Sequence, residues 1–138
     1  MSAVKELIRT EEDGSISFGD YELDAKTKRS DYEHEGDIYK VKTYKEITRL
    51  EKNEMFVYES EPGTAVFGLR EDADGVSFSV EGNGGAQITV QGAAETEYDI
   101  IIDGEMRDTE RANLGGKISF SLELDPERAV GVELVRHN

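Results

Sequence analysis

The 138-residue chain contains no cysteine and no tryptophan. Without cysteine there are no disulfides and no thiolate metal ligands, a composition that is compatible with a reducing compartment. Histidine is almost as scarce, because only His34 and His137 occur and neither belongs to a His-Glu-x-x-His motif. We therefore expect no bound metal and no other cofactor.

Long hydrophobic runs are also missing. The first residues, Met-Ser-Ala-Val-Lys-Glu-Leu-Ile-Arg, lack the continuous apolar segment of a signal peptide. No later segment approaches the length that is needed to span a bilayer. These features predict a cytoplasmic protein that does not associate with membranes.

Positive charge is in short supply. The chain has 16 Lys and Arg residues against 31 Asp and Glu residues, which gives a formal net charge of −15. Phosphate backbones and anionic membranes are bound by basic surfaces that displace counterions, so a nucleic-acid partner is not expected. The acidity is uneven, because residues 1–60 hold ten basic against fifteen acidic residues while residues 61–138 hold six against sixteen.

This change in charge falls at Glu61-Pro62-Gly63, which is the clearest boundary signal in the chain. It predicts an N-terminal unit of residues 1–61 and a C-terminal unit of residues 62–138.

What the sequence has in abundance is the period-two alternation of β-strands. In residues 117–124, apolar and polar side chains alternate strictly, so Ile118, Phe120, Leu122 and Leu124 share one face. A similar strand at residues 97–102 ends at Asp103-Gly104, a dipeptide that favours the positive φ angles of a two-residue hairpin. Ile101 interrupts its polar face, and we expect the N-terminal unit to cover it.

Seven short strands are predicted in the C-terminal unit, at the spacing of a β-sandwich. They cover residues 64–69, 76–80, 87–90 and 97–102, a short return near Met106, and residues 118–124 and 130–135. Turn signals separate them, and no convincing helical stripe intervenes. The pattern of this half is similar to immunoglobulin-like or fibronectin-type sandwiches.

The N-terminal unit is predicted to be small and rich in hairpins. Asp13-Gly14 should turn a strand over Val4–Thr10 back into Ser15–Phe18, and the charged residues 24–36 are expected to form a loop. Residues 38–50 are predicted to be strand, and residues 47–50 would pair with residues 55–58 as a second hairpin across Lys52-Asn53-Glu54. A short helix over residues 41–51 is the alternative, because apolar residues there recur every three positions.

Five of the six tyrosines lie between Tyr21 and Tyr58, within this N-terminal unit. Amphipathic strand residues packing a small sheet would explain them, and so would an aromatic platform for a ligand. The candidate ligand-binding residues are Tyr32, Tyr39 and Tyr44. On the second interpretation we expect the strands that carry them to face outward.

No catalytic residue can be assigned from a motif. Gly-x-Ser-x-Gly is absent. With 31 acidic residues, pairs of carboxylates occur by chance, so a glycosidase pair cannot be argued from their presence.

The whole chain also resembles a group of small uncharacterised proteins of anaerobic Firmicutes that are sometimes labelled endosialidase. The resemblance rests on Lys5-Glu-Leu-Ile-Arg-Thr10, Asp13-Gly-Ser-Ile-Ser-Phe-Gly19, Tyr39-Lys-Val-Lys-Thr43 and Phe56-Val-Tyr-Glu-Ser60. The label implies sialidase chemistry on a large propeller, for which this chain is too short. Lacking tryptophan, it cannot contain the Ser-x-Asp-x-Gly-x-Thr-Trp repeat of that superfamily.

The sequence therefore predicts an all-β protein composed of the hairpin unit and a seven-strand immunoglobulin-like sandwich. Its expected function is that of a non-catalytic binding or assembly module, which docks to a protein partner or to itself through sheet edges. A carbohydrate-binding domain and a small carbohydrate-active enzyme are the alternatives.

Overall fold

The computed structural model describes residues 3–137, and all regular secondary structure within this range is β-strand. Apart from the three-residue strands β1 and β2, the strands have six to nine residues, and they follow from the alternating pattern of the sequence with turns at Gly, Asp and Asn. The strands are β1 (Ile8–Thr10), β2 (Ile16–Phe18), β3 (Thr27–His34), β4 (Asp37–Tyr44), β5 (Ile47–Lys52), β6 (Met55–Glu61), β7 (Thr64–Asp72), β8 (Gly75–Gly82), β9 (Gly84–Gln91), β10 (Glu97–Ile102), β11 (Glu105–Arg111), β12 (Lys117–Leu124) and β13 (Val130–Arg136).

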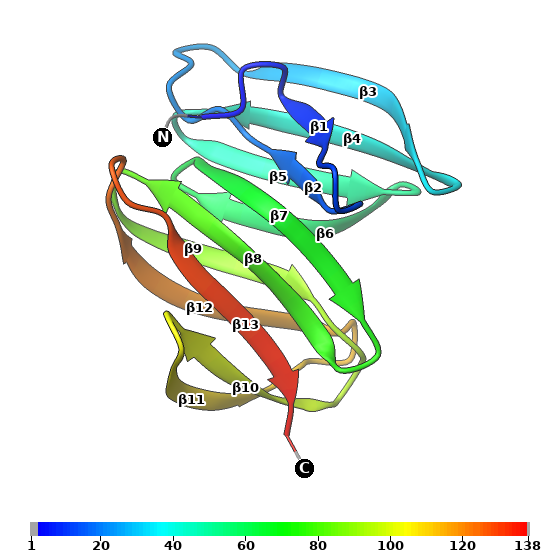
Figure 1. Cartoon of the computed structure of the whole chain (residues 1–138), viewed down its shortest axis with the longest axis vertical. Helices are drawn as coiled ribbons and strands as arrows, with labels where there is room; N and C mark the ends of the chain where they lie inside the picture. The colour runs from blue at the N-terminus through cyan, green and yellow to red at the C-terminus, as the bar shows by residue number, and fades with distance from the viewer. Residues whose placement is uncertain (1–2, 138) are drawn as a thin grey trace.

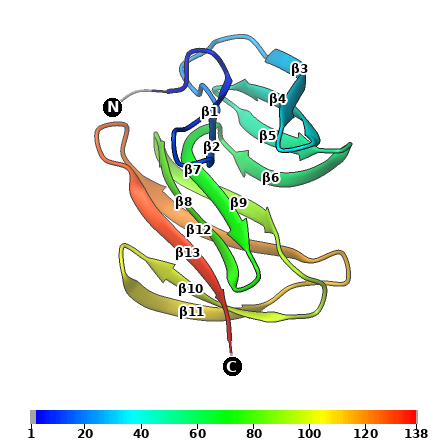
Figure 2. The same cartoon turned by 45° about the vertical axis from the view of Figure 1, so that its right-hand side comes forward.

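These strands form two antiparallel sheets that pack on each other (Figure 1). The seven-stranded sheet has the order β1-β2-β7-β8-β13-β10-β11, and the six-stranded sheet has the order β12-β9-β6-β5-β4-β3. Strands β1 to β6 gather at one end of the molecule and β10 and β11 at the other, where β13 ends and the C-terminus lies (Figures 1 and 2). The prediction of an all-β protein is confirmed.

Both sheets combine strands from the two sides of Pro62. Strand β2 pairs with β7 in the larger sheet, and β6 pairs with β9 in the smaller one. Of the seven C-terminal strands, five belong to the larger sheet and two to the smaller sheet. The segments 1–61 and 62–138 therefore extend common sheets, and their buried residues belong to one main hydrophobic cluster.

The centre of this cluster is an aromatic contact between the sheets. Tyr58 of β6 is fully buried, and its ring packs edge-on against Phe18 of β2 at 5.2 Å and Phe78 of β8 at 5.7 Å between ring centroids. Its hydroxyl lies 2.8 Å from Thr64 Oγ1 at the start of β7. Tyr58 thus links the smaller sheet to two strands of the larger sheet, β2 before Pro62 and β8 after it.

The strands predicted in the C-terminal half are all present, and Asp103 and Gly104 adopt positive φ angles of 51° and 82°, as the hairpin requires. The second hairpin is also present, because residues 47–50 and 55–58 belong to β5 and β6, which pair with each other. The segment 38–50 is divided into β4 and β5 by a turn at residues 45–46. The alternative helix over residues 41–51 is wrong. Cross-strand hydrogen bonds and a buried face of Val41, Thr43, Thr48 and Leu50 decide for strand.

Three other expectations are wrong. Residues 24–36 are not a loop, since Thr27–His34 forms β3, an edge strand whose mostly exposed side chains leave no apolar alternation to detect. The first strand is limited to Ile8–Thr10 rather than Val4–Thr10, and Leu7, with φ of 74°, turns the chain just before it. Ile101 is not covered by residues 1–61, because β13, β8 and β7 separate β10 from β2.

A group of buried hydroxyls joins the two sheets beside Tyr58. Thr48 Oγ1 lies 2.8 Å from Thr43 Oγ1 and donates to Thr64 O at 2.8 Å, and Thr64 N donates back to Thr48 Oγ1 at 3.0 Å. Ser60 Oγ lies 2.8 Å from Thr64 Oγ1. Each of these hydroxyl groups thus has a partner, which limits the cost of its burial.

Glu81 is a buried carboxyl group of β8, opposite Ala65 of β7. Its Oε2 accepts a hydrogen bond from the hydroxyl of Tyr21 at 3.0 Å, whereas its Oε1 has no hydrogen-bond partner among the described residues. Burial raises the pKa of Glu81 above its ordinary value, because desolvation disfavours the charged form. Burial likewise raises the pKa of Tyr21.

We expect a Glu81→Gln variant to gain stability relative to the original protein as the pH rises. Because the pKa of Glu81 is higher in the folded state, its protonated form adds to the free energy of unfolding. This stabilisation is fully present below the pKa of the unfolded state and is lost as the pH rises through the pKa of the folded state. The amide does not titrate, so the gain should grow by about 1.4 kcal/mol for each pH unit between the two pKa values. Urea unfolding of both proteins between pH 4 and pH 8 measures it, and a difference that does not change with pH would contradict the prediction.

Within residues 3–137 no helix is long and apolar enough to cross a membrane.

Candidate functional site

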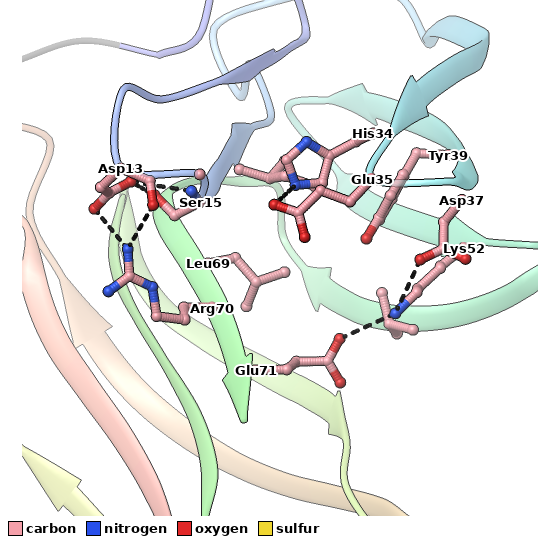
Figure 3. Close-up of a pocket in the computed structure, with 13 residues that line it drawn as sticks. Asp13, Ser15, His34, Glu35, Asp37, Tyr39, Lys52, Leu69, Arg70 and Glu71 are labelled. Atoms are coloured by element: carbon pink, nitrogen blue, oxygen red, sulfur yellow. Dashed lines mark hydrogen bonds and ion pairs between the residues drawn. The ribbon is translucent and has the colours of Figure 1, made fainter. Parts of the chain in front are cut away.

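A pocket of about 350 Å³ opens between the two sheets at the end that holds β1 to β4. The larger sheet contributes the turn between β1 and β2 and the outer part of β7, and the smaller sheet contributes the turn between β3 and β4 and the end of β5 (Figure 3). The turns come close to each other, since a Cβ atom added to Gly14 would lie 3.4 Å from Glu35 Oε2.

The floor of the pocket is apolar and its mouth is charged. Ile16, Tyr39, Val57 and Leu69 form the floor as part of the edge of the hydrophobic core. The mouth carries four carboxylates, Asp13, Glu35, Asp37 and Glu71, against the two permanent cations Lys52 and Arg70. An opening that combines apolar surface with a few converging polar groups is the usual form of a small-molecule site.

One side of the mouth is fixed by an ion pair between two elements of the larger sheet, the β1–β2 turn and β7. Arg70 Nη2 of β7 lies 2.8 Å from Asp13 Oδ2 and also donates to Asp13 O at 3.2 Å. Ser15 donates to Asp13 Oδ1 from both its backbone nitrogen, at 3.0 Å, and its hydroxyl, at 2.6 Å. The hydrogen bonds from Ser15 and the neighbouring Arg70 lower the pKa of Asp13, so this carboxylate stays ionised.

Lys52 spans the other side of the mouth at looser distances. Its Nζ lies 3.6 Å from Asp37 Oδ2 and 3.6 Å from Glu71 Oε1, so it bridges the two sheets without a short hydrogen bond to either carboxylate (Figure 3). Asp37 Oδ1 accepts a shorter bond of 2.8 Å from Asn53 Nδ2, and this bond, together with the charge of Lys52, lowers the pKa of Asp37. The nearby carboxylates raise the pKa of Lys52 against the effect of its partial burial.

His34 lies in the pocket wall between a hydroxyl and a carboxylate. Its Nδ1 is 3.2 Å from Thr10 Oγ1, and its Nε2 is 3.5 Å from Glu35 Oε2. This order of groups is that of a nucleophile, a base and an orienting acid. However, the Glu35 side chain is 71% exposed and Thr10 Oγ1 is already 2.8 Å from the hydroxyl of Tyr32. A solvated carboxylate and a shared hydroxyl give little activation, so the arrangement fixes the β1–β3 contact.

The three tyrosines predicted to bind a ligand do not share one face. Tyr39 is 6% exposed, points into the core and lines the pocket floor. Tyr32 lies opposite it on β3 and is partly buried against the core. Tyr44 points to the other face of β4, because positions 39 and 44 differ by an odd number of residues, and its ring lies 5.8 Å from Lys26 Nζ. Tyr32 and Tyr39 are therefore neighbours, and no flat aromatic platform unites all three.

The expectation that the tyrosine-bearing strands face outward is wrong for most of these residues, since Tyr21, Tyr39 and Tyr58 are buried. The charged residues of the pocket mouth were missed by sequence reasoning. Each of the turns Asp13-Gly14 and Glu35-Gly36 can be recognised from its own residues. Their close approach, however, depends on the packing of β1 against β3, which no short motif predicts.

In the described part of the chain, no three His, Asp or Glu side chains are grouped so that they could hold a metal ion. The four carboxylates of the pocket mouth are instead spread over both sheets. Asp37 and Glu71 lie near Lys52, Asp13 pairs with Arg70, and Glu35 lies beside His34.

Comparison with protein-family models, with curated proteins and with solved structures found no match to this chain. The resemblances drawn from the sequence therefore stay predictions.

Proposed function

We propose that this protein is a non-catalytic binding module whose ligand occupies the pocket between the sheets, and that the ligand carries a small organic cation such as an amine or a guanidinium group. The observation that supports the proposal is the composition of the pocket, which places four carboxylates and two cations around an apolar floor. Lys52 is held by its acidic neighbours only at 3.6 Å, so a ligand cation could reach Glu71 and Asp37 with shorter bonds.

A binding role fits the protonation of the pocket better than acid–base catalysis does. A glycosidase needs one carboxylic acid with a raised pKa beside a second, ionised carboxylate. Neighbouring donors and cations lower the pKa of Asp13 and Asp37 instead. Glu81, whose pKa is raised, is buried against Tyr21 and does not line the pocket. The small carbohydrate-active enzyme remains the less favoured alternative.

A carbohydrate ligand also remains a weaker alternative, because it was expected to need the common aromatic face that the three tyrosines do not form. An immunoglobulin-like arrangement of residues 62–138 beside a hairpin unit is part of the same proposal. The seven strands β7–β13 support it, while the pairing of β2 with β7 and of β6 with β9 argues for a more continuous sandwich.

Titration of the protein with agmatine, which has an amine at one end and a guanidinium group at the other, tests the proposed function. We expect saturable chemical-shift changes at Tyr39, Val57 and Leu69 in NMR spectra, and no comparable change with citrate at equal ionic strength. A Glu71→Gln variant should weaken binding by at least about tenfold, since a charge-assisted hydrogen bond contributes about 1.5–3 kcal/mol.

Glu46→Gln is the matched control, because Glu46 is exposed in the turn after β4 and does not line the pocket. It should bind agmatine within about twofold of the original protein. Equal binding of citrate and agmatine, or equal losses in both variants, would contradict a cation site in this pocket.

A further inference from the structure

The two sheets end in four edge strands, which differ in how well they are protected against pairing with another chain. Strands β1 and β11 end the larger sheet, and β3 and β12 end the smaller sheet. Edge strands of soluble proteins are commonly short, bulged, or provided with inward-pointing charges, because an open strand edge pairs readily with a further strand.

Three of the four edges carry such protection. Strand β1 has only three residues. Strand β3 is bulged between Arg29 and Tyr32, where Asp31 has a φ of 59°, and the hydroxyl of Tyr32 joins it to Thr10 of β1 at 2.8 Å. Strand β11 is bulged against β10 between Ile100 and Ile101.

Strand β12 has none of these features. Its eight residues pair with β9 in an unbroken register, from Lys117 opposite Gln91 to Leu124 opposite Gly84. Its inward face is wholly apolar, and one member of that face, Phe120, stays only partly buried because no strand lies beyond it. The outer edge of β12 is therefore long, regular and partly apolar, which are the properties of a strand that accepts a partner.

A groove of about 350 Å³ runs along this edge and is lined by residues of β10, β11 and β12. Figure 2 shows the hairpin of β10 and β11 at the same end of the molecule as this edge. Ile100, Ile102 and Leu122 form its apolar floor together with Phe120. No hydrogen bond or ion pair between side chains crosses from β11 to β12 within residues 3–137, in contrast to the bridged edges of β1 and β3. The groove shares no lining residue with the pocket described above, so the two are separate spaces.

The facing wall of the groove is acidic. Asp108 lies directly opposite Ile100 and Glu110 lies directly opposite Tyr98 in the pairing of β10 with β11. Residues that are directly opposite share a face, and Ile100 and Tyr98 point inward, so both carboxylates point toward the space between the sheets. Arg107 is the one cation of the wall. The chain around the groove is also acidic, since residues 61–138 hold sixteen acidic and six basic residues.

We propose that the groove binds an extended segment of a partner protein, added as a strand to the free edge of β12, with Lys or Arg at every second position. The backbone of this segment would pair with β12, and its inward side chains would lay their aliphatic stems on Phe120 and place their charges at Asp108 and Glu110. Its outward side chains would continue the polar face of Ser119 and Ser121.

The acidic wall and the two-residue period of a β-strand together favour a segment with Lys or Arg at every second position. An acidic or wholly apolar strand would leave the carboxylates of β11 facing like charge or an unpaired position, which costs affinity. A second copy of this chain is disfavoured as the occupant, because β12 would bring Ile118, Phe120 and Leu122 rather than cations to the acidic wall.

The test uses a fluorescein-labelled peptide of sequence Lys-Thr-Lys-Val-Lys-Thr-Lys-Val with blocked ends, and the 138-residue protein in 150 mM salt. Fluorescence anisotropy should show saturable binding that is at least about tenfold tighter than that of an isomeric peptide with its four lysines in one block. In NMR spectra, amide signals of residues 117–124 should shift, and their hydrogen exchange should slow.

An Asp108→Lys/Glu110→Lys variant should weaken binding of the alternating peptide by at least about tenfold. Glu12→Lys/Glu46→Lys changes the net charge equally at exposed turn positions and should stay within about threefold of the original protein. These four residues are exposed, so loss of the fold does not confuse the comparison.

A Phe120→Ser variant provides a second, independent test of the groove. It should weaken the alternating peptide while leaving agmatine binding in the pocket unchanged, which separates this proposal from the proposed function. Equal affinity for the two lysine peptides, or equal losses in both double variants, would overturn the inference. So would chemical-shift changes confined to β3 and β4. A stable dimer in light scattering that Phe120→Ser dissociates would also overturn it, because the edge of β12 would then be occupied by a second copy.

Discussion

Replacement of Tyr58 by alanine should lower the free energy of unfolding by about 3–5 kcal/mol, which is the loss typical of a large aromatic side chain removed from a packed core. Tyr58 is 0% exposed and touches the rings of Phe18 and Phe78 on the opposite sheet. The cavity would lie where β2, β6 and β8 meet, at the joint between the N-terminal and C-terminal strands. Since small proteins are stable by about 5–15 kcal/mol, the variant should be close to unfolding.

Tyr58→Phe is the control for this prediction, because it keeps both edge-on ring contacts and removes only the bond to Thr64 Oγ1. It should cost about 1 kcal/mol, since Thr64 Oγ1 keeps Ser60 as a partner. Urea denaturation followed by circular dichroism measures both variants. If the alanine and phenylalanine variants lost the same small amount, the aromatic contact would not hold the two sheets together.

Most strands could be predicted from the sequence because a half-buried strand has apolar and polar residues at alternate positions. Residues 117–124 show this directly, and their alternation matches the buried face of β12 in the structure. Strand β3 could not be predicted in the same way. As an edge strand with polar side chains on both faces, it carries no alternation, and its pairing with β4 is decided by the backbone and by contacts with β1.

The way in which the strands combine into sheets was also beyond the sequence. The change in charge at Pro62 suggested two units, but pairing between β2 and β7 depends on residues about fifty positions apart. Such long-range pairing follows from the burial of both sheet faces together, and local composition does not report it.

In the candidate sites, too, residue types could be predicted from the sequence but their positions in space could not. A tyrosine is recognisable in a sequence, but whether it serves the core or the surface depends on its position along the strand. Tyr39 and Tyr44 lie five positions apart on β4 and therefore point to opposite faces. The acidic wall of the groove is likewise defined by register, because Asp108 becomes an inward-facing residue only through its pairing with Ile100.

Gly63→Ala should be among the most damaging single-methyl changes in the protein, with an expected loss of about 3 kcal/mol in the free energy of unfolding. Gly63 lies where the chain crosses from β6 in the smaller sheet to β7 in the larger sheet, and its N–H donates to Lys45 O at 3.0 Å. A Cβ atom there would lie 2.0 Å from the carbonyl oxygen of Tyr44 and 3.3 Å from Tyr21 Cβ. Backbone atoms cannot rotate away, so the end of β4 or the whole crossover would have to move.

Gly131→Ala is the matched control, since it adds the same methyl group to a strand glycine that has room for it. The new Cβ atom would lie 3.6 Å from Asp103 Oδ1, which is an ordinary contact, and Gly131 has no positive φ angle. This variant should be neutral or more stable by up to about 1 kcal/mol, because alanine restricts the unfolded chain more than glycine does. Urea unfolding of the two variants side by side decides the matter. Similar stabilities would mean that β4 and the crossover can separate without cost, contrary to the close approach of Gly63 to Tyr44.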